Sequence, residues 1–148
     1  MWQAQKFCYC ISLQIGCIII SFFTLFLCTG HLVEYFRLQE NDWVMLLWGL
    51  LHLVASLCLS YSVLMHRALV AILIYLIIET VYLIYAIIYA SVSSALKTNT
   101  YSNYGLTYSI VFWSFVVLIC VITTYFLYII TSYYCLRRQQ RNAANTQA

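Results

Sequence analysis

Four long stretches of this 148-residue chain are almost free of charged side chains. Residues 7–33, 43–65 and 98–136 contain no Asp, Glu, Lys or Arg, and residues 68–96 contain only Glu79. About 20 helical residues, each rising about 1.5 Å, cross the roughly 30 Å hydrocarbon core of a bilayer. Each stretch is therefore long enough to cross a membrane once. The four predicted spans are about residues 11–33, 43–65, 69–91 and 108–134.

The composition excludes a soluble domain. Hydrophobic residues make up 65% of the chain and charged residues only 7%, whereas soluble domains carry about 25% charged residues. This balance excludes a soluble enzyme, a nucleic-acid-binding domain and a disordered chain. The lipid bilayer is the expected surrounding, and we expect no nucleic-acid partner.

Helices fit these stretches better than barrel strands do. Barrel strands alternate apolar and polar residues, but a segment such as 69–74 is apolar on every side. A helix also satisfies its own backbone hydrogen bonds in lipid. We therefore predict a single all-α membrane domain over residues 1–148, an antiparallel bundle of four transmembrane helices, with a polar, disordered tail at 135–148. The alternative, cleavage of the first stretch as a signal peptide, is disfavoured because that stretch exceeds the usual 7–15 residues.

The basic residues predict which way the bundle faces. Basic side chains favour the cytoplasmic side. Five of the seven basic residues fall on one side of the predicted bundle, against Arg37 and Lys97 on the other. Both termini and the short turn at 66–68 are therefore predicted to be cytoplasmic. The same five residues can contact anionic lipid of the inner leaflet, although setting the orientation is the simpler role. They are Lys6, Arg67, Arg137, Arg138 and Arg141.

Glu79 is the one residue whose position calls for a chemical explanation. It falls near the middle of the third stretch, where an ionised carboxylate is costly and the neutral acid is favoured. Counting outward from the tight turn, His52 lies at nearly the same depth and can pair with it. Tyr75 and Tyr82 share its helix face and offer hydroxyls to the carboxyl group. Two interpretations stay open: a pairing that locks two helices together, and a proton- or cation-coupled pathway.

The cysteines and remaining histidines predict no metal or cofactor. None of the seven cysteines falls in a predicted outer loop, which argues against an extracellular disulfide framework. Cys8, Cys10 and Cys135 fall at the predicted cytoplasmic membrane edge, where reversible palmitoylation occurs. A zinc site at Cys8 and Cys10 lacks enough ligands. His31 and His66 are expected to be solvated residues at the membrane interface, and no sequence motif of an enzyme is present.

The opening of the chain resembles a known family. Residues 6–20 follow the pattern K-x-C-x-C-x-S-L-x-x-G-C-x-I-I, in which Cys8, Cys10, Gly16 and Cys17 are the matching cysteine and glycine positions. This pattern is similar to that of a family of small insect four-span proteins. The family includes the pasiflora proteins of septate junctions and is distantly similar to the lysosomal LAPTM group. Beyond about residue 20, the resemblance rests on the number and spacing of the spans.

The resemblance implies a non-enzymatic, multi-pass plasma-membrane protein that has no cofactor. Such a protein would help to assemble a lateral membrane complex, for example a septate junction that forms a paracellular barrier. Its expected partners are other membrane proteins, and a second copy of the chain is one possibility. An endosomal or lysosomal adaptor and a Glu79-dependent transporter are the alternatives. The chain has no proline, so it lacks the proline–tyrosine sorting motif of LAPTM-type tails.

Overall fold

The computed structural model of the chain describes residues 6–7, 11–37, 43–65, 68–96 and 105–146. Two short strands, β1 (Lys6–Phe7) and β2 (Ile11–Ser12), form an antiparallel pair ahead of the helices. The helices follow in the order α1 (Leu13–Arg37), α2 (Trp43–Leu64), α3 (Leu69–Ala95) and α5 (Leu106–Thr146). Each of these four helices is long and apolar enough to cross a membrane.

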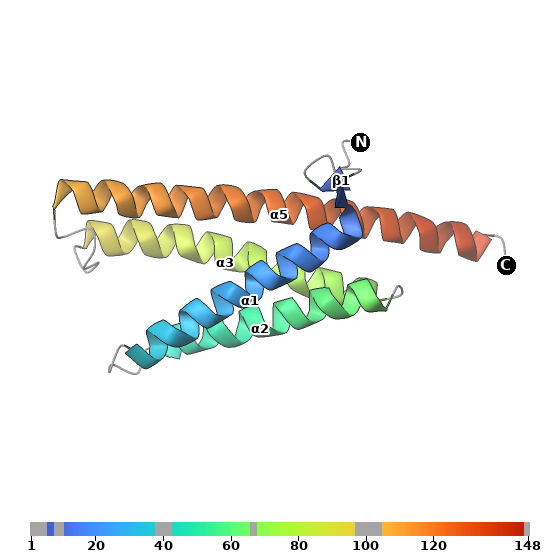
Figure 1. The fold of residues 1–148 in the computed structure, drawn as a ribbon, viewed down its shortest axis with the longest axis horizontal. Helices are drawn as coiled ribbons and strands as arrows, with labels where there is room; N and C mark the ends of the chain where they lie inside the picture. Colours follow the sequence, from blue (N-terminus) through green and yellow to red (C-terminus); the bar gives the residue numbers. More distant parts are fainter. Residues whose placement is uncertain (1–5, 8–10, 38–42, 66–67, 97–104, 147–148) are drawn as a thin grey trace.

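The four helices run up and down as two hairpins (Figure 1). α1 lies along α2, and α3 lies along α5, with α2 and α3 in contact between them. The start of α1 and the end of α5 lie at the same end of the bundle, as an even number of crossings requires. The predicted four-helix antiparallel membrane bundle is confirmed. The cytoplasmic location of the two termini stays a prediction from the basic residues.

The predicted spans agree with the helices except at their ends. α1 and α3 continue past residues 33 and 91, and α5 begins at Leu106, directly after Gly105, whose positive φ of 138° suits glycine. The prediction of a disordered tail is wrong for residues 135–146, because α5 continues to Thr146.

The helical tail has a physical explanation. No proline or glycine interrupts residues 106–146, and the Leu, Arg, Gln and Ala residues of the tail favour a helix. One turn also carries a specific contact, because Arg137 Nε donates a hydrogen bond of 3.0 Å to the Tyr133 hydroxyl. At about 1.5 Å per residue, α5 is about 60 Å long, twice what a bilayer core requires.

The core lies at the end of the bundle where α1 begins and α5 leaves it. Leu13, Cys17 and Ile20 of α1 meet buried side chains of the other three helices. Gly16, which shares the opening sequence pattern with Cys17, is buried too. Leu13, Gly16, Cys17 and Ile20 of the pattern are therefore packing residues, whereas Ser12 and Ile19 are exposed. The other members of the cluster are Ala55, Leu59, Val63, Ile72, Tyr75, Ile129, Ile130 and Tyr133.

Small residues bring α1 and α2 close together. Ser21 Oγ donates a hydrogen bond to the Ser56 carbonyl at 2.9 Å and lies 2.7 Å from Ser60 Oγ. Ser56 Oγ donates in return to the Ser21 carbonyl at 3.0 Å. At Gly49, an added Cβ would lie only 2.9 Å from the Leu32 side chain. Close approach at small and hydroxyl residues is the usual packing of membrane helices.

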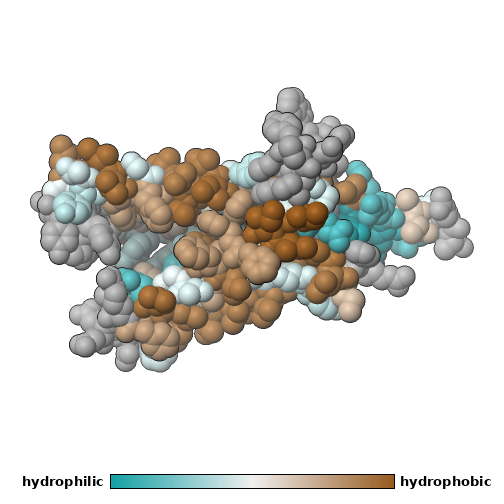
Figure 2. All heavy atoms as spheres, viewed as in Figure 1, coloured by the Kyte–Doolittle hydropathy of each residue, from teal (hydrophilic) through white to brown (hydrophobic). Residues whose placement is uncertain are grey.

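Apolar side chains cover the outside of the bundle (Figure 2). Large hydrophobic residues on all four helices are exposed, among them Phe22, Leu57, Ile77 and Val117. The hydrophilic residues gather on the part of α5 that extends beyond the other helices. A soluble protein rarely exposes so much apolar surface. The chain is therefore an integral membrane protein of the multi-pass class.

Candidate intramembrane polar site

Glu79 and His52 meet between α3 and α2, as their equal distance from the tight turn predicts. His52 Nε2 lies 3.8 Å from Glu79 Oε1, and the two residues are 0% and 2% exposed. That distance is longer than a hydrogen bond. Neither atom has a hydrogen-bond partner among the residues that the structure describes. Two buried polar atoms thus face each other across a helix interface.

The other ring nitrogen of His52 defines the chemistry of the pair. His52 Nδ1 lies 2.7 Å from the carbonyl oxygen of Trp48, which can only accept, so Nδ1 carries a hydrogen. Nε2 of the neutral ring then presents a lone pair to Glu79. One further proton, on either the carboxyl group or Nε2, gives the pair zero net charge. The pair can therefore stay in the bilayer without a net charge, which is the state that low dielectric favours.

The two tyrosines on the Glu79 face bond elsewhere. Tyr75 Oη lies 3.1 Å from Thr24 Oγ1, and Tyr82 Oη lies 3.1 Å from His31 Nε2. Both partners belong to α1, so the expectation that these hydroxyls bond the Glu79 carboxyl group is wrong. The tyrosines instead tie α3 to α1. The reason is geometric, because the long tyrosine side chains reach polar atoms of α1 at hydrogen-bond distance.

His31 belongs to this site, which the sequence did not indicate. It was expected to be a solvated residue at the interface, but it is half-buried. Its ring centroid lies 5.2 Å from that of His52, and the His52 ring lies edge-on to Tyr82 at 4.4 Å. The expectation failed because hydropathy places His31 near the end of a span and says nothing about which way the side chain points.

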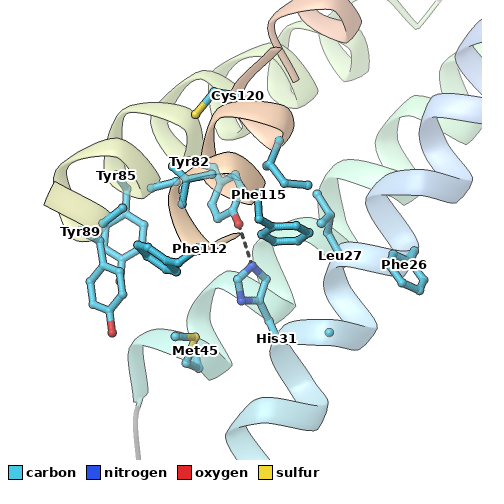
Figure 3. A pocket seen from close by; sticks show the side chains of 15 residues that line it. Phe26, Leu27, His31, Met45, Tyr82, Tyr85, Tyr89, Phe112, Phe115 and Cys120 are labelled. Carbon is cyan, nitrogen blue, oxygen red and sulfur yellow. Dashed lines mark hydrogen bonds between the residues drawn. The ribbon is translucent and has the colours of Figure 1, made fainter. Parts of the chain in front are cut away.

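A cavity adjoins the site on the side of α5 (Figure 3). It has a volume of about 410 Å³, and residues of all four helices line it. His31 and Tyr82, joined by their hydrogen bond, form part of its wall. The rest of the wall is mostly aliphatic and aromatic, so the cavity suits an apolar molecule with a single polar group.

The remaining predicted residues fall outside this site. Arg138 and Arg141 are exposed on the tail of α5, and Arg137 lies over the Tyr133 ring with Cζ 5.1 Å from its centroid. Cys135 is a half-buried free cysteine on the same helix. Their roles in lipid contact and palmitoylation stay predictions. Three predicted positions, and the side chain of a fourth, lie outside the described residues: Cys8, Cys10, Arg67 and the Lys6 side chain.

Neither a possible metal site in the described residues nor a similarity to a known protein adds information on function. Within the described ranges, no group of three or more His, Cys, Asp or Glu side chains could hold a metal ion. Comparison with known proteins finds no matching family model, curated protein or solved structure. What the fold and the site define is a class: a multi-pass membrane protein of four helices with a buried polar pair at its centre.

Proposed function

We propose that this chain is a non-enzymatic scaffold that holds a lateral complex of membrane proteins together. The observation that carries the proposal is the position of α5 at the edge of the bundle. Only 6% of the most apolar stretch of α5 is buried, against 28–33% in the other three helices. A helix with so little contact inside its own chain has most of its surface available to a neighbouring helix.

The exposed side of α5 carries residues that suit helix–helix contact. Small and β-branched side chains recur there at intervals of three, four and seven residues, the spacing of a helix-packing seam. Such residues let two helices approach closely in lipid, where van der Waals packing rather than the hydrophobic effect drives association. We call this set the α5 seam. It consists of Ser114, Val117, Val121, Thr124 and Thr131.

The opening sequence pattern supports the finer proposal of a septate junction. In the family that the pattern resembles, small four-span proteins act in these occluding junctions at the plasma membrane. Gly16 and Cys17 are buried packing residues in this chain, which fits a structural rather than a chemical role. Under this proposal, epithelia that lack the protein leak tracer dye between cells and mislocalise junction partners, and normal dye exclusion would count against it.

Enlarging one valine of the α5 seam is expected to release the partners. Val121 and Val111 form a matched pair on α5, because they are 61% and 63% exposed but point about 80° apart around the helix. Val121→Phe should overpack the contact and lower the recovered complex at least about fivefold, while Val111→Phe leaves it unchanged. The measurement is the size of the tagged protein in native membranes solubilised in mild detergent.

Two results of this experiment contradict the scaffold. In the first, the wild-type protein migrates alone in the mild detergent. In the second, both phenylalanine variants keep the complex intact. The thermal stability of each purified variant provides the control, since neither side chain is buried inside the bundle and neither variant should change folding by more than about 0.5 kcal/mol.

The Glu79–His52 pair favours a second candidate, a small proton- or cation-coupled transporter. Its supporting observation is that both facing atoms are buried without hydrogen-bond partners among the described residues. Transport predicts a cation flux into vesicles that Glu79→Gln abolishes. The scaffold predicts background flux for both proteins. An endolysosomal adaptor is the third candidate, and imaging of the tagged protein in native tissue separates it from a plasma-membrane scaffold.

A further inference from the structure

The cavity between the two helix hairpins opens sideways between α1 and α5. Phe26 of α1 and Phe115 of α5 both line it, and they are 71% and 61% exposed. Toward the other end of the bundle, Phe23 and Phe126 close the gap with ring centroids 5.2 Å apart. The two hairpins diverge beyond that contact, which leaves the hollow seen in Figure 2. In a bilayer, the molecules that reach such an opening are lipids.

The polar side chains of the cavity wall include the hydrogen-bonded pair of His31 and Tyr82, beside the hydroxyl groups of Tyr85 and Tyr89. His31 Nε2 is bonded to the Tyr82 hydroxyl, while His31 Nδ1 has no partner among the described residues. The imidazole ring lies among Met45, Phe112 and Phe115 in the cavity wall (Figure 3). His31 is six residues before the end of α1 at Arg37, or about 9 Å along the helix axis. The polar group is therefore a short distance inside the membrane boundary.

Small residues keep a flat space open beside that group. Ala86 and Ala90 lie one turn apart on α3, and Gly30 lies opposite on α1. A Cβ atom added at Gly30 would meet nothing within 4 Å. Aromatic rings of Tyr85 and Phe112 complete the walls. A rigid, flat molecule fits between such surfaces with little loss of conformational entropy, whereas a flexible acyl chain must be ordered to fill them.

We propose that this cavity binds one membrane sterol, with the sterol hydroxyl at His31 and the ring system between the small residues and the aromatic rings. A volume of about 410 Å³ is within the range of about 300–1,000 Å³ that single small ligands occupy. The depth of His31 matches a hydroxyl just below the lipid head groups. A phospholipid acyl chain has no hydrogen-bonding group to place there. This inference is independent of the scaffold function.

Photocrosslinking tests the site in the full-length protein. The protein is reconstituted in phosphatidylcholine vesicles that contain a photoreactive cholesterol analogue, and the labelled peptides are mapped by mass spectrometry. Labels are expected on α1, α3 and α5 beside the cavity, with competition by unlabelled cholesterol. Cholestene, which lacks the hydroxyl group, should compete about threefold to tenfold less well because it loses one hydrogen bond.

A cavity-filling variant tests the site, and a second leucine variant on the same helix is its matched control. Gly30→Leu places a side chain in the open space and should reduce labelling at least about fivefold, while Val33→Leu on the same helix, which does not line the cavity, leaves it unchanged. Gly30→Leu should fold, because leucine favours a helix more than glycine does. Equal labelling of Gly30→Leu and wild type would overturn the proposal. Labelling of the same peptides by a photoreactive phosphatidylcholine, without competition by cholesterol, would also overturn it.

Discussion

Replacing Glu79 and His52 together by leucine is expected to restore most of the stability that either single replacement removes. Glu79→Leu removes the acidic group that faces His52 Nε2 at 3.8 Å, and His52→Leu removes the base that faces the Glu79 carboxyl group, so each leaves one buried polar group without the group that balances its charge. Each orphaned group should cost about 1–3 kcal/mol. The double variant removes both groups, so it should be close to the wild type, and the coupling energy should be about 1–3 kcal/mol.

The free energy of unfolding in mixed micelles measures this coupling. Glu79→Gln is the control, because its amide keeps a neutral polar group of the same shape facing His52 Nε2, and it should remain within about 1 kcal/mol of the wild type. If the losses of the two single variants simply add in the double variant, the two side chains do not act as a pair.

Truncating Tyr75 is expected to cause the largest loss of stability from a single substitution. Tyr75 is 1% exposed, belongs to the core cluster of the bundle and has its hydroxyl beside Thr24. Tyr75→Ala should lower the free energy of unfolding by about 3–5 kcal/mol, because it leaves a cavity where three helices meet. Tyr75→Phe keeps the ring and loses only the hydrogen bond, so it should cost about 0.5–1.5 kcal/mol.

Tyr61 is the matched control for Tyr75. It is also a tyrosine in a membrane-spanning helix, but it is 54% exposed on α2. Tyr61→Ala should change the stability by no more than about 0.5 kcal/mol in the same mixed micelles. Equal losses for Tyr75→Ala and Tyr61→Ala would contradict the rotation of α3 that points Tyr75 inward.

Hydropathy and charge predicted the number, the order and the antiparallel arrangement of the helices, because lipid imposes a simple rule on sequence. A helix must hide its backbone and cannot hold many charges across about 30 Å of hydrocarbon. The short turn between α2 and α3 also set their register, which is why Glu79 and His52 could be paired by counting. Both predictions use distances along the chain, and these are known from the sequence.

Contacts that depend on helix rotation and crossing were not predictable in the same way. Tyr75 and Tyr82 of α3 bond to Thr24 and His31 of α1. No local pattern encodes the relative rotation of the two helices, so these contacts were missed. The cavity arises from the divergence of the two hairpins, which is a property of packing. The helical tail was missed for another reason, because a polar composition was read as disorder although no residue there breaks a helix.

Mapping which segments reach the lumen tests the central claim, a membrane bundle of four crossings with both termini in the cytoplasm. The chain has no N-x-S/T acceptor, so an acceptor inserted with a flexible spacer reports its own location by glycosylation. We expect glycosylation of insertions within 38–42 and within 97–104, and none at either terminus or at 66–67. Glycosylation at one terminus but not at the other would contradict the account, because it requires an odd number of crossings.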